Sequence, residues 1–193
     1  MSSPFPSVYL VRHGQTAWSL SGQHTGRTDI PLTDEGKAQA RALAPRLASV
    51  TFARVLSSPL LRARQTAELA GFGDRLEIEP ALAEWHYGTY EGRKTSEIRA
   101  ERPGWGLFED GAPGGESLEQ VAARADDLIT RLRALSGNSL LFAHRDILRV
   151  IAARWAALPA IDARRLYLDP TSISVLGYDH SLEEPIIRVL NSR

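Results

Sequence analysis

The stretch "YLVRHGQTAW", Tyr9–Trp18, places an arginine, a histidine and a glycine directly behind a short apolar run. The run Val8–Val11 fits a buried strand that ends at Arg12. A guanidinium and an imidazole therefore follow one another where a strand leaves the core. Because ligands of open α/β sheets bind beyond the carboxyl ends of the strands, this stretch predicts both a sheet and a site at its edge.

Strands and helices alternate along the rest of the chain. Further strands are expected at ARVLSS (53–58), LEIEP (76–80), NSLLFAH (138–144), SISVLGY (172–178) and IIRVL (186–190). Capping signals place helix starts at Thr33, at Ser58 followed by Pro59, and at Ser117 with Gln120. A long surface loop is expected over Arg102–Gly115, which is rich in glycine and proline. The alternation predicts an α/β fold, a three-layer α/β/α sandwich around a mostly parallel sheet.

Length and composition narrow the class of protein. The 193 residues suffice for one core but not for two, so a single domain over residues 1–193 is expected. Basic and acidic side chains balance at 23 each, so no net field attracts nucleic acid or an anionic membrane. The absence of cysteine excludes disulfides and thiolate chemistry. No leader pattern and no apolar run of membrane-spanning length occur, so a cytoplasmic protein is expected.

Polar side chains follow three of the expected strands. They are Arg12 with His13, Ser57 with Ser58, and His144 with Arg145. One histidine at a strand end is more often a solvated turn residue or a hydrogen-bonded rim residue than a catalyst. Two of them, each beside an arginine, favour a shared binding site for an anion.

Arg62 and Glu84 are the other candidates outside these strand ends. An arginine in the first turn of a helix opposes the helix dipole, unless an anion is bound at that N-terminus. Arg62 is also compatible with an ordinary solvated side chain. Glu84 follows an apolar stretch, so partial burial would raise its pKa toward that of a general acid. Glu91 and Glu97, by contrast, are interpreted as surface carboxylates.

Several other chemistries lack their motifs. The sequence has no GxxxxGK[ST] loop and no GxSxG elbow, and "GFG" at 71–73 is too short for a dinucleotide fingerprint. None of the five histidines stands in HxH or HExxH spacing, so neither a metal site nor a cofactor is expected. Phosphoryl transfer here would therefore draw its positive charge from side chains.

"LVRHGQTAW" resembles the signature of the histidine phosphatase superfamily, also called phosphoglycerate mutase-like. The family's further segments follow in order as "QHTGRTDIPLTDEGKAQA", "SSPLLRARQTAE", "EWHYGTYEG", "GGES" and "FAH". Together these segments span nearly the whole chain and are highly specific for the family, whereas RHG alone would be weak evidence for it. "EWHYGTYEG" is most similar to the sugar-phosphate and acid phosphatase branch, which includes sedoheptulose-bisphosphatase-like enzymes.

The resemblance implies a phosphoglycerate mutase-like fold and a role for each of five residues. His13 would be the nucleophile, phosphorylated on one ring nitrogen while the other bonds a backbone carbonyl. Arg12, Arg62 and His144 would hold the phosphoryl oxygens and stabilise their charge. Glu84 would protonate the leaving alkoxide and then, as a carboxylate, activate the water that attacks phosphohistidine.

Further phosphate or substrate contacts are expected at Ser19, Gln23, Thr25, Gly26 and Arg145. Ser19 stands where many relatives have asparagine, and Arg145 where glycine is common. Turned inward, Arg145 would bind a second anionic group of the substrate. The alternative, slightly favoured, is that it points to solvent and pairs with Asp146. Selectivity is expected from these side chains and from segment 102–115, Gln15 and His86.

The expected function is metal-independent hydrolysis of small phosphate monoesters, mainly sugar phosphates, through phosphohistidine on His13. A small-molecule phosphate ester is then the only partner required, and the choice between monomer and homodimer stays open. Two alternatives remain, a cofactor-dependent phosphoglycerate mutase-type phosphoryl transfer and a non-catalytic phosphate-binding protein. The short chain favours hydrolysis over a mutase, because Arg102–Gly115 is the only obvious lid. A protein that only binds phosphate would not need Glu84.

Overall fold

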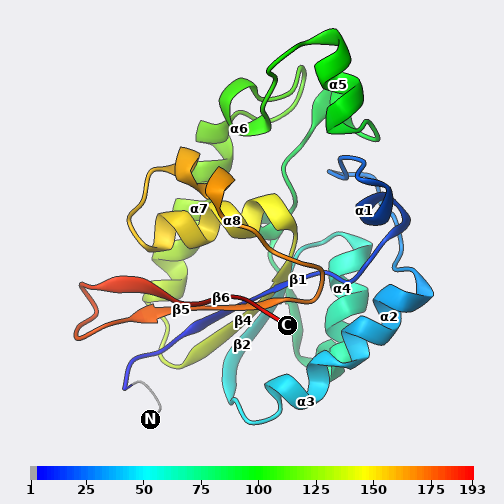
Figure 1. Cartoon of the computed structure of the whole chain (residues 1–193). Coiled ribbons are helices and arrows are strands. Elements are labelled where there is room, and N and C mark those ends of the chain that lie inside the picture. Colours follow the sequence, from blue (N-terminus) through cyan, green and yellow to red (C-terminus); the bar gives the residue numbers. More distant parts are fainter. Residues whose placement is uncertain (1–3) are drawn as a thin grey trace.

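The computed structural model describes residues 4–193, and within them the strands form one six-stranded sheet (Figure 1). The strands are β1 (Val8–Arg12), β2 (Phe52–Ser57), β3 (Leu76–Ile78), β4 (Asn138–Ala143), β5 (Ile173–Tyr178) and β6 (Pro185–Ser192). Their order is β3-β2-β4-β1-β5-β6, parallel from β3 to β1. β5 runs antiparallel to both β1 and β6. The expected mostly parallel α/β sheet is confirmed, with β5 as its antiparallel member.

Helices cover both faces of the sheet (Figure 1). They are α1 (Ala17–Ser21), α2 (Asp34–Arg41), α3 (Leu43–Leu47), α4 (Leu61–Ala67), α5 (Thr95–Glu101), α6 (Leu107–Asp110), α7 (Leu118–Arg133) and α8 (Arg145–Trp155). A π-helical turn at Glu68–Phe72 and 3₁₀ turns at Gly73–Arg75, Pro80–Leu82, Gly88–Tyr90 and Ala160–Arg165 complete them. Because strand side chains alternate, Leu10 packs in the core that contains α7 and α8, and Val11 in the core that contains α3 and α4. The three-layer arrangement is therefore confirmed.

The ends of the central strands are aligned with one another. Arg12 of β1 pairs with Ala143 of β4, and the His13 backbone N–H donates to the Ala143 carbonyl at 2.9 Å. On the other side of β4, the Ser58 N–H donates to the Phe142 carbonyl at 2.9 Å. The residues that leave β1, β2 and β4 therefore emerge at one edge of the sheet. This register is what brings the predicted site residues together.

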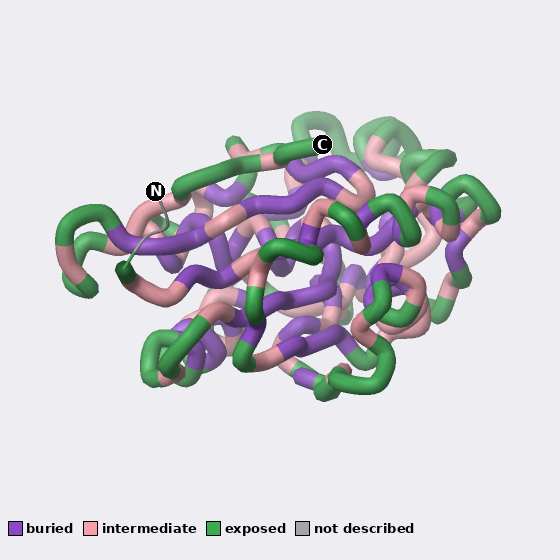
Figure 2. Tube along the Cα trace, turned by 90° about the horizontal axis from the view of Figure 1, so that it is seen from below, coloured by how far each residue is buried: buried purple, intermediate pink, exposed green. Residues whose placement is uncertain are grey.

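Local capping explains two of the helix starts. The Thr33 hydroxyl accepts from the Gly36 N–H at 3.0 Å and begins α2. Ser117 and Gln120 form the predicted reciprocal capping box of α7. Both helices therefore begin where the sequence predicts. Buried residues run through the middle of the molecule, whereas no residue of β6 is buried (Figure 2). Among the described residues, no helix is both long and apolar enough to cross a membrane. Residues 1–3, part of the stretch inspected for a leader, lie outside those described.

The predicted start of the helix after β2 is wrong. Helix α4 begins at Leu61, with Leu60 as its N-cap and no side-chain cap. The Ser58 hydroxyl contacts His144 Nε2 at 2.7 Å and accepts from the Leu60 N–H at 3.2 Å. Ser58 therefore faces the neighbouring strand end, and the helix begins later.

Segment 102–115 is not the expected plain surface loop. It contains α6, and Trp105, Leu107 and Phe108 are buried. The Trp105 indole donates to the Gly111 carbonyl at 2.9 Å, and the Phe108 ring packs edge-on against Trp85, 5.2 Å between centroids. Glycine and proline dominate its composition, but its aromatic residues decide its position, because burying them in the core stabilises the fold.

Candidate active site

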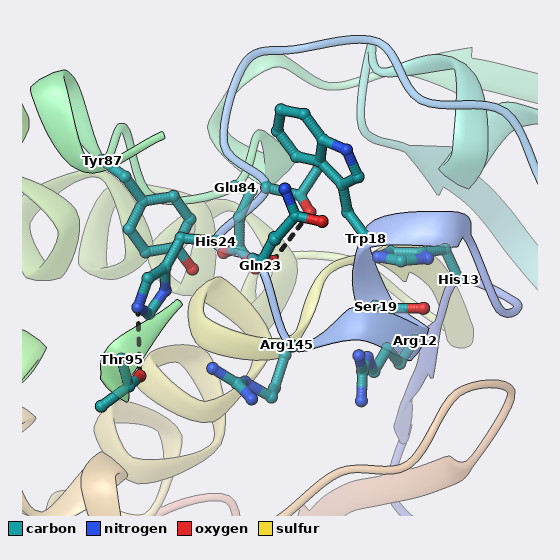
Figure 3. A pocket seen from close by; sticks show the side chains of 12 residues that line it. Arg12, His13, Trp18, Ser19, Gln23, His24, Glu84, Tyr87, Thr95 and Arg145 are labelled. Atoms are coloured by element: carbon teal, nitrogen blue, oxygen red, sulfur yellow. Dashed lines mark hydrogen bonds between the residues drawn. The ribbon is translucent and has the colours of Figure 1, made fainter. Parts of the chain in front are cut away.

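A cavity of about 100 Å³ lies at the aligned strand ends (Figure 3). One water molecule needs roughly 10–15 Å³, so the cavity has room for a larger group. Its walls are formed by Arg12, His13, Trp18, Ser19, Gly22, Gln23, His24, Thr25, Glu84, Tyr87, Thr95 and Arg145. The cavity therefore combines two cations, a carboxyl group and two imidazoles from distant parts of the chain.

His13 is held in one tautomer. Its Nδ1–H donates to the Gly14 carbonyl at 2.7 Å, which leaves Nε2 without a proton in the neutral ring. Burial lowers the pKa of His13 well below its ordinary value, and the charges of Arg62 and Arg12 lower it further. The imidazole is thus neutral at physiological pH, with Nε2 available as a nucleophile. The expected hydrogen bond to a backbone carbonyl is confirmed.

His144 lies beside His13 but behind the cavity wall. The two ring centroids are 5.2 Å apart, and His144 is fully buried. Its Nε2 contacts the Ser58 hydroxyl, while its Nδ1 has no hydrogen-bond partner among the described residues. Burial, followed by the charge of Arg62, lowers the pKa of His144. A buried polar atom without a partner is costly, so Nδ1 is poised to bond an incoming group.

Arg12 lines the cavity, whereas Arg62 does not. Arg12 Nη1 donates to the Leu168 carbonyl at 2.7 Å, and its Nε has no partner among the described residues. Burial and the nearby Arg145 lower the pKa of Arg12 to about 10, so it stays charged at neutral pH. Arg62 is fully buried and donates to the carbonyls of Thr25 and Thr28, at 3.0 and 3.1 Å. Its buried Nε likewise has no partner in residues 4–193.

Glu84 lies at the N-terminus of α8. Its carboxylate accepts from the backbone N–H groups of Trp85, Asp146 and Ile147 at 2.9, 3.1 and 3.0 Å. Burial raises the pKa of Glu84, as does the negative charge of Asp146, and these effects outweigh the three hydrogen bonds, which lower it. The cavity is therefore bordered by a carboxyl group with a raised pKa and by a neutral histidine.

Asp146 anchors a buried network beside Glu84. Its carboxylate accepts from the Tyr87 hydroxyl at 2.6 Å, from Arg149 Nη1 at 2.7 Å and from Arg145 Nε at 3.1 Å. Burial alone would raise the pKa of Asp146, but the two arginines and Tyr87 hold it well below its usual range. The pairing expected between Arg145 and Asp146 is present. The expectation that Arg145 points away to solvent is wrong, because its half-exposed side chain lines the cavity.

Of the four smaller residues expected to contact phosphate or substrate, three line the cavity and one does not. Ser19, Gln23 and Thr25 line the cavity, whereas Gly26 does not. The Ser19 hydroxyl donates to the Thr16 carbonyl at 3.0 Å and accepts from the Thr16 N–H at 2.8 Å in the capping box of α1, so its proton is already in use. The Gly26 N–H donates to Glu91 at 2.9 Å and its carbonyl accepts from Arg62. Gly26 therefore supports the site from behind.

Gln15 and His86, expected to contribute to selectivity, lie outside the cavity walls. Gln15 Oε1 accepts from the Thr33 hydroxyl at 2.9 Å, and Gln15 borders a different cavity. The backbone of Gln15 also lies so close to Gly36 that a side chain at position 36 would collide with the Gln15 carbonyl. Contacts with α2 therefore determine where Gln15 lies.

Sequence reasoning missed one supporting carboxylate and interpreted another correctly. Glu91 accepts from the N–H groups of Gly26, Arg27 and Thr28, at 2.9, 3.3 and 2.9 Å, so it holds the loop that binds Arg62. Glu97 is exposed and caps α5. His24 and Tyr87 were also not singled out, although both stand within the quoted motifs. Position in a motif was their only sequence signal.

A sequence model of the histidine phosphatase superfamily (branch 1) matches residues 8–191. The chain belongs to this family. The family and its phosphatase-named members make the chain a phosphoric monoester hydrolase. A solved structure of an open reading frame from Mycobacterium tuberculosis superposes with a TM-score of 0.91 at 36% identity, covering 97% of both chains. The fold class expected from the resemblance is therefore confirmed.

Curated relatives carry both phosphatase and mutase names. The chain is 38% identical over 181 residues to an acid phosphatase of Mycobacterium tuberculosis, covering 92% of this chain and 89% of the relative. It is 36% identical over 184 residues to a "Probable phosphoglycerate mutase GpmB" of Photorhabdus laumondii, covering 90% and 86%. It is 35% identical over 193 residues to a sedoheptulose 1,7-bisphosphatase of Saccharomyces cerevisiae, covering 82% and 70%.

Proposed function

We propose that this histidine phosphatase hydrolyses small phosphate monoesters, sugar phosphates above all, without a metal ion and through phosphohistidine on His13. One observation carries the proposal. The free Nε2 of His13 and the carboxyl group of Glu84 border the same cavity, and the environment of each shifts its pKa toward the protonation state that its step requires. The relatives named acid phosphatase and sugar bisphosphatase support the substrate class.

In the first step, Nε2 of His13 attacks phosphorus, and the ester P–O bond breaks as the P–N bond forms. Glu84 gives its proton to the departing alkoxide oxygen, so the alcohol leaves neutral. In the second step, the Glu84 carboxylate takes a proton from water. The water oxygen attacks phosphorus, the P–N bond breaks, and phosphate leaves with His13 neutral again. Both proton transfers thus use one carboxyl group.

The charge that develops on the phosphoryl group is compensated by side chains. Arg12 borders the cavity, and its Nε–H is free to bond an oxygen. His144 Nδ1 is also free, and with Ser58 donating to Nε2 it carries the proton that a phosphoryl oxygen would accept. Arg62 acts mainly through its charge and its hold on the loop at Thr25–Thr28, leaving Nε–H for an oxygen. Such preorganised donors stabilise the transition state without reorganisation.

The donor set around the cavity favours metal independence. Among residues 4–193, the side chains grouped so that they could hold a metal ion are Asp179, His180 and Glu184. All three are exposed at the hairpin between β5 and β6, and none lines the cavity. The cavity itself offers cations, which would repel a metal ion and attract phosphate.

The mutase alternative needs a separate test. The short chain was expected to favour hydrolysis, but a relative with a mutase name spans nearly the same length, so length does not decide between them. Hydrolysis and transfer share the phosphohistidine step and differ in whether water or an alcohol accepts the phosphoryl group.

The proposal is tested by incubating the enzyme with a panel of phosphate esters in EDTA, measuring inorganic phosphate, and assaying phosphoglycerates for isomerisation in parallel. Phosphate release that EDTA does not inhibit is the expected result. Isomerisation without release would make the protein a mutase. Release that EDTA abolishes and a divalent ion restores would overturn metal independence, and silence in both assays would favour a non-catalytic protein.

A further inference from the structure

A second cavity adjoins the first across a shared wall. It has a volume of about 120 Å³, and His24, Thr95 and Arg145 border both cavities. Its other walls are Arg99, Trp105, Gly106, Leu107, Phe108, Asp146 and Arg149. Arg145 lies between Thr95 and Arg12 in the view of Figure 3. A ligand with its phosphoryl group at His13 would therefore extend past Arg145.

The cations of the second cavity outnumber its carboxylates. Arg99, Arg145 and Arg149 face it, with Asp146 as its only acidic side chain in the described part of the chain. Arg149 is fully engaged, because it donates to Asp146 and to the carbonyls of Ala163 and Arg164. Within residues 4–193, Arg99 donates only through Nε, to the Trp105 carbonyl at 2.8 Å. Donors of Arg99 and Arg145 thus remain available.

Arg145 is paired with Asp146, whose charge is the strongest influence on its pKa, but Arg145 keeps a free donor. Its two contacts with that carboxylate are the long ones, 3.1 and 3.4 Å. Arg149 at 2.7 Å and the Tyr87 hydroxyl at 2.6 Å also bond the buried Asp146. Arg145 Nη1 makes no hydrogen bond with the described residues, and the side chain is 40% exposed. A guanidinium so placed can bond a ligand through Nη1 while it keeps its ion pair with Asp146.

Arg145 and Arg12 also repel one another. Both border the first cavity, and the charge of Arg145 disfavours that of Arg12. Like charges that converge on one cavity are destabilising unless an anion lies between or beside them. A single phosphoryl group at His13 meets Arg12, whereas a second anionic group one substituent away would meet Arg145.

We infer that Arg145 is a specificity residue, and that the enzyme prefers phosphate monoesters with a second anionic group, a carboxylate or another phosphate, which Arg145 binds between the two cavities. The inference rests on the proposed function, because it assigns the substrate's other end at the same site. Arg99 faces the same space and would assist when the second group lies deeper.

Two matched substrate pairs test this inference and distinguish the two anions. 3-Phosphoglycerate is compared with glycerol 3-phosphate for the carboxylate, and fructose 1,6-bisphosphate with fructose 6-phosphate for the second phosphate. The measured quantity is the ratio of kcat/KM within each pair. We expect at least a tenfold preference for the doubly anionic member of at least one pair, and the pair that shows it identifies the anion.

The variants Arg145→Ala and Arg145→Gln should reduce that ratio at least tenfold, through KM. The glutamine variant retains a donor for Asp146 but loses the charge. Arg154→Ala is the matched control, since Arg154 also lies on α8 and pairs with an aspartate, Asp126, away from both cavities. It should leave the ratio unchanged.

If the Arg145 variants lowered kcat/KM equally for both substrates of a pair, Arg145 would act only through Asp146, and the inference would be overturned. A wild-type ratio near one in both pairs, or a preference that survives both variants, would also overturn it. In each of these cases phosphate release by the wild type would leave the proposed function standing. Release from no ester at all would instead overturn the proposed function, and this inference with it.

Discussion

The carboxyl group of Glu84 accepts a hydrogen bond from the backbone N–H of Asp146 at 3.1 Å, while the ionised side chain of Asp146 lies close enough to raise the pKa of Glu84. One residue therefore both holds the acid and, together with burial, raises its pKa. The backbone bond lowers the pKa and the side-chain charge raises it, so the two influences can be separated by mutation.

Replacing Asp146 with asparagine should shift the pH profile of kcat/KM. Glu84 must carry a proton in the first step, so activity falls as pH rises through its pKa. Removing the negative charge of Asp146 lowers that pKa, because the carboxylate of Glu84 then forms more readily. The alkaline limb should therefore move to lower pH, while Asp126→Asn, which breaks an ion pair elsewhere, should leave it in place. An alkaline limb that stays put or moves upward would contradict this assignment.

The leaving group should decide how much Glu84→Gln slows the enzyme. An alkoxide needs a proton as it departs, whereas p-nitrophenolate is stable without one. We expect kcat/KM to fall about 10²–10⁴-fold for an alkyl phosphate and far less for p-nitrophenyl phosphate. The measurement is a comparison of both substrates on wild type and variant. Equal slowing of the two would show that Glu84 is not the general acid.

Two adjacent serines allow a test of whether Ser58 positions His144, with Ser57 as the control. The Ser58 hydroxyl contacts His144 Nε2 at 2.7 Å, whereas the Ser57 hydroxyl bonds only the Ser58 carbonyl among the described residues. Ser58→Ala leaves a buried imidazole nitrogen without a partner, so kcat should fall about tenfold and unfolding should require about 1–3 kcal/mol less free energy. Ser57→Ala should keep kcat within about threefold. Similar kinetics for the two variants would remove Ser58 from the positioning of His144.

Glu91 should be worth more to stability than a surface carboxylate. It accepts from three backbone N–H groups of the loop at 26–28, whose carbonyls in turn bind Arg62. Glu91→Ala should lower the free energy of unfolding by about 1–3 kcal/mol and weaken inhibition by inorganic phosphate. Glu97→Ala serves as the control and should cost less, because Glu97 caps an exposed helix end. Equal losses for both would contradict the supporting role of Glu91.

The sequence predicted best what strand order and register determine. Arg12 ends β1, and His13 and His144 directly follow β1 and β4, which lie side by side, so a pattern of apolar runs was enough to place them at one edge. The motifs added Glu84, whose partners Trp85, Asp146 and Ile147 are backbone groups that any residue would supply.

Side-chain directions could not be predicted in the same way. Arg62 directs its Nη groups to carbonyls more than thirty residues away, and Gly26 turns its N–H to Glu91. Ser58 contacts His144 instead of capping a helix. These choices depend on contacts between segments distant in the chain, which local capping and spacing rules do not contain. The direction of the Arg145 side chain could not be predicted for the same reason, because it depends on the contact with Asp146 and on the cavity beside it.

The central claim is that His13 carries the phosphoryl group, and rapid-quench trapping tests it most directly. The enzyme is mixed with a slowly hydrolysed ester, quenched in base to preserve phosphohistidine, and digested for mass spectrometry. Glu84→Gln should accumulate more of the intermediate when p-nitrophenyl phosphate is the donor, since the second step also needs the carboxylate. We predict one phosphoryl group, on His13 alone, and none in His13→Ala. Phosphate release by the wild type with no modified histidine, or turnover of His13→Ala near the wild-type rate, would contradict the account.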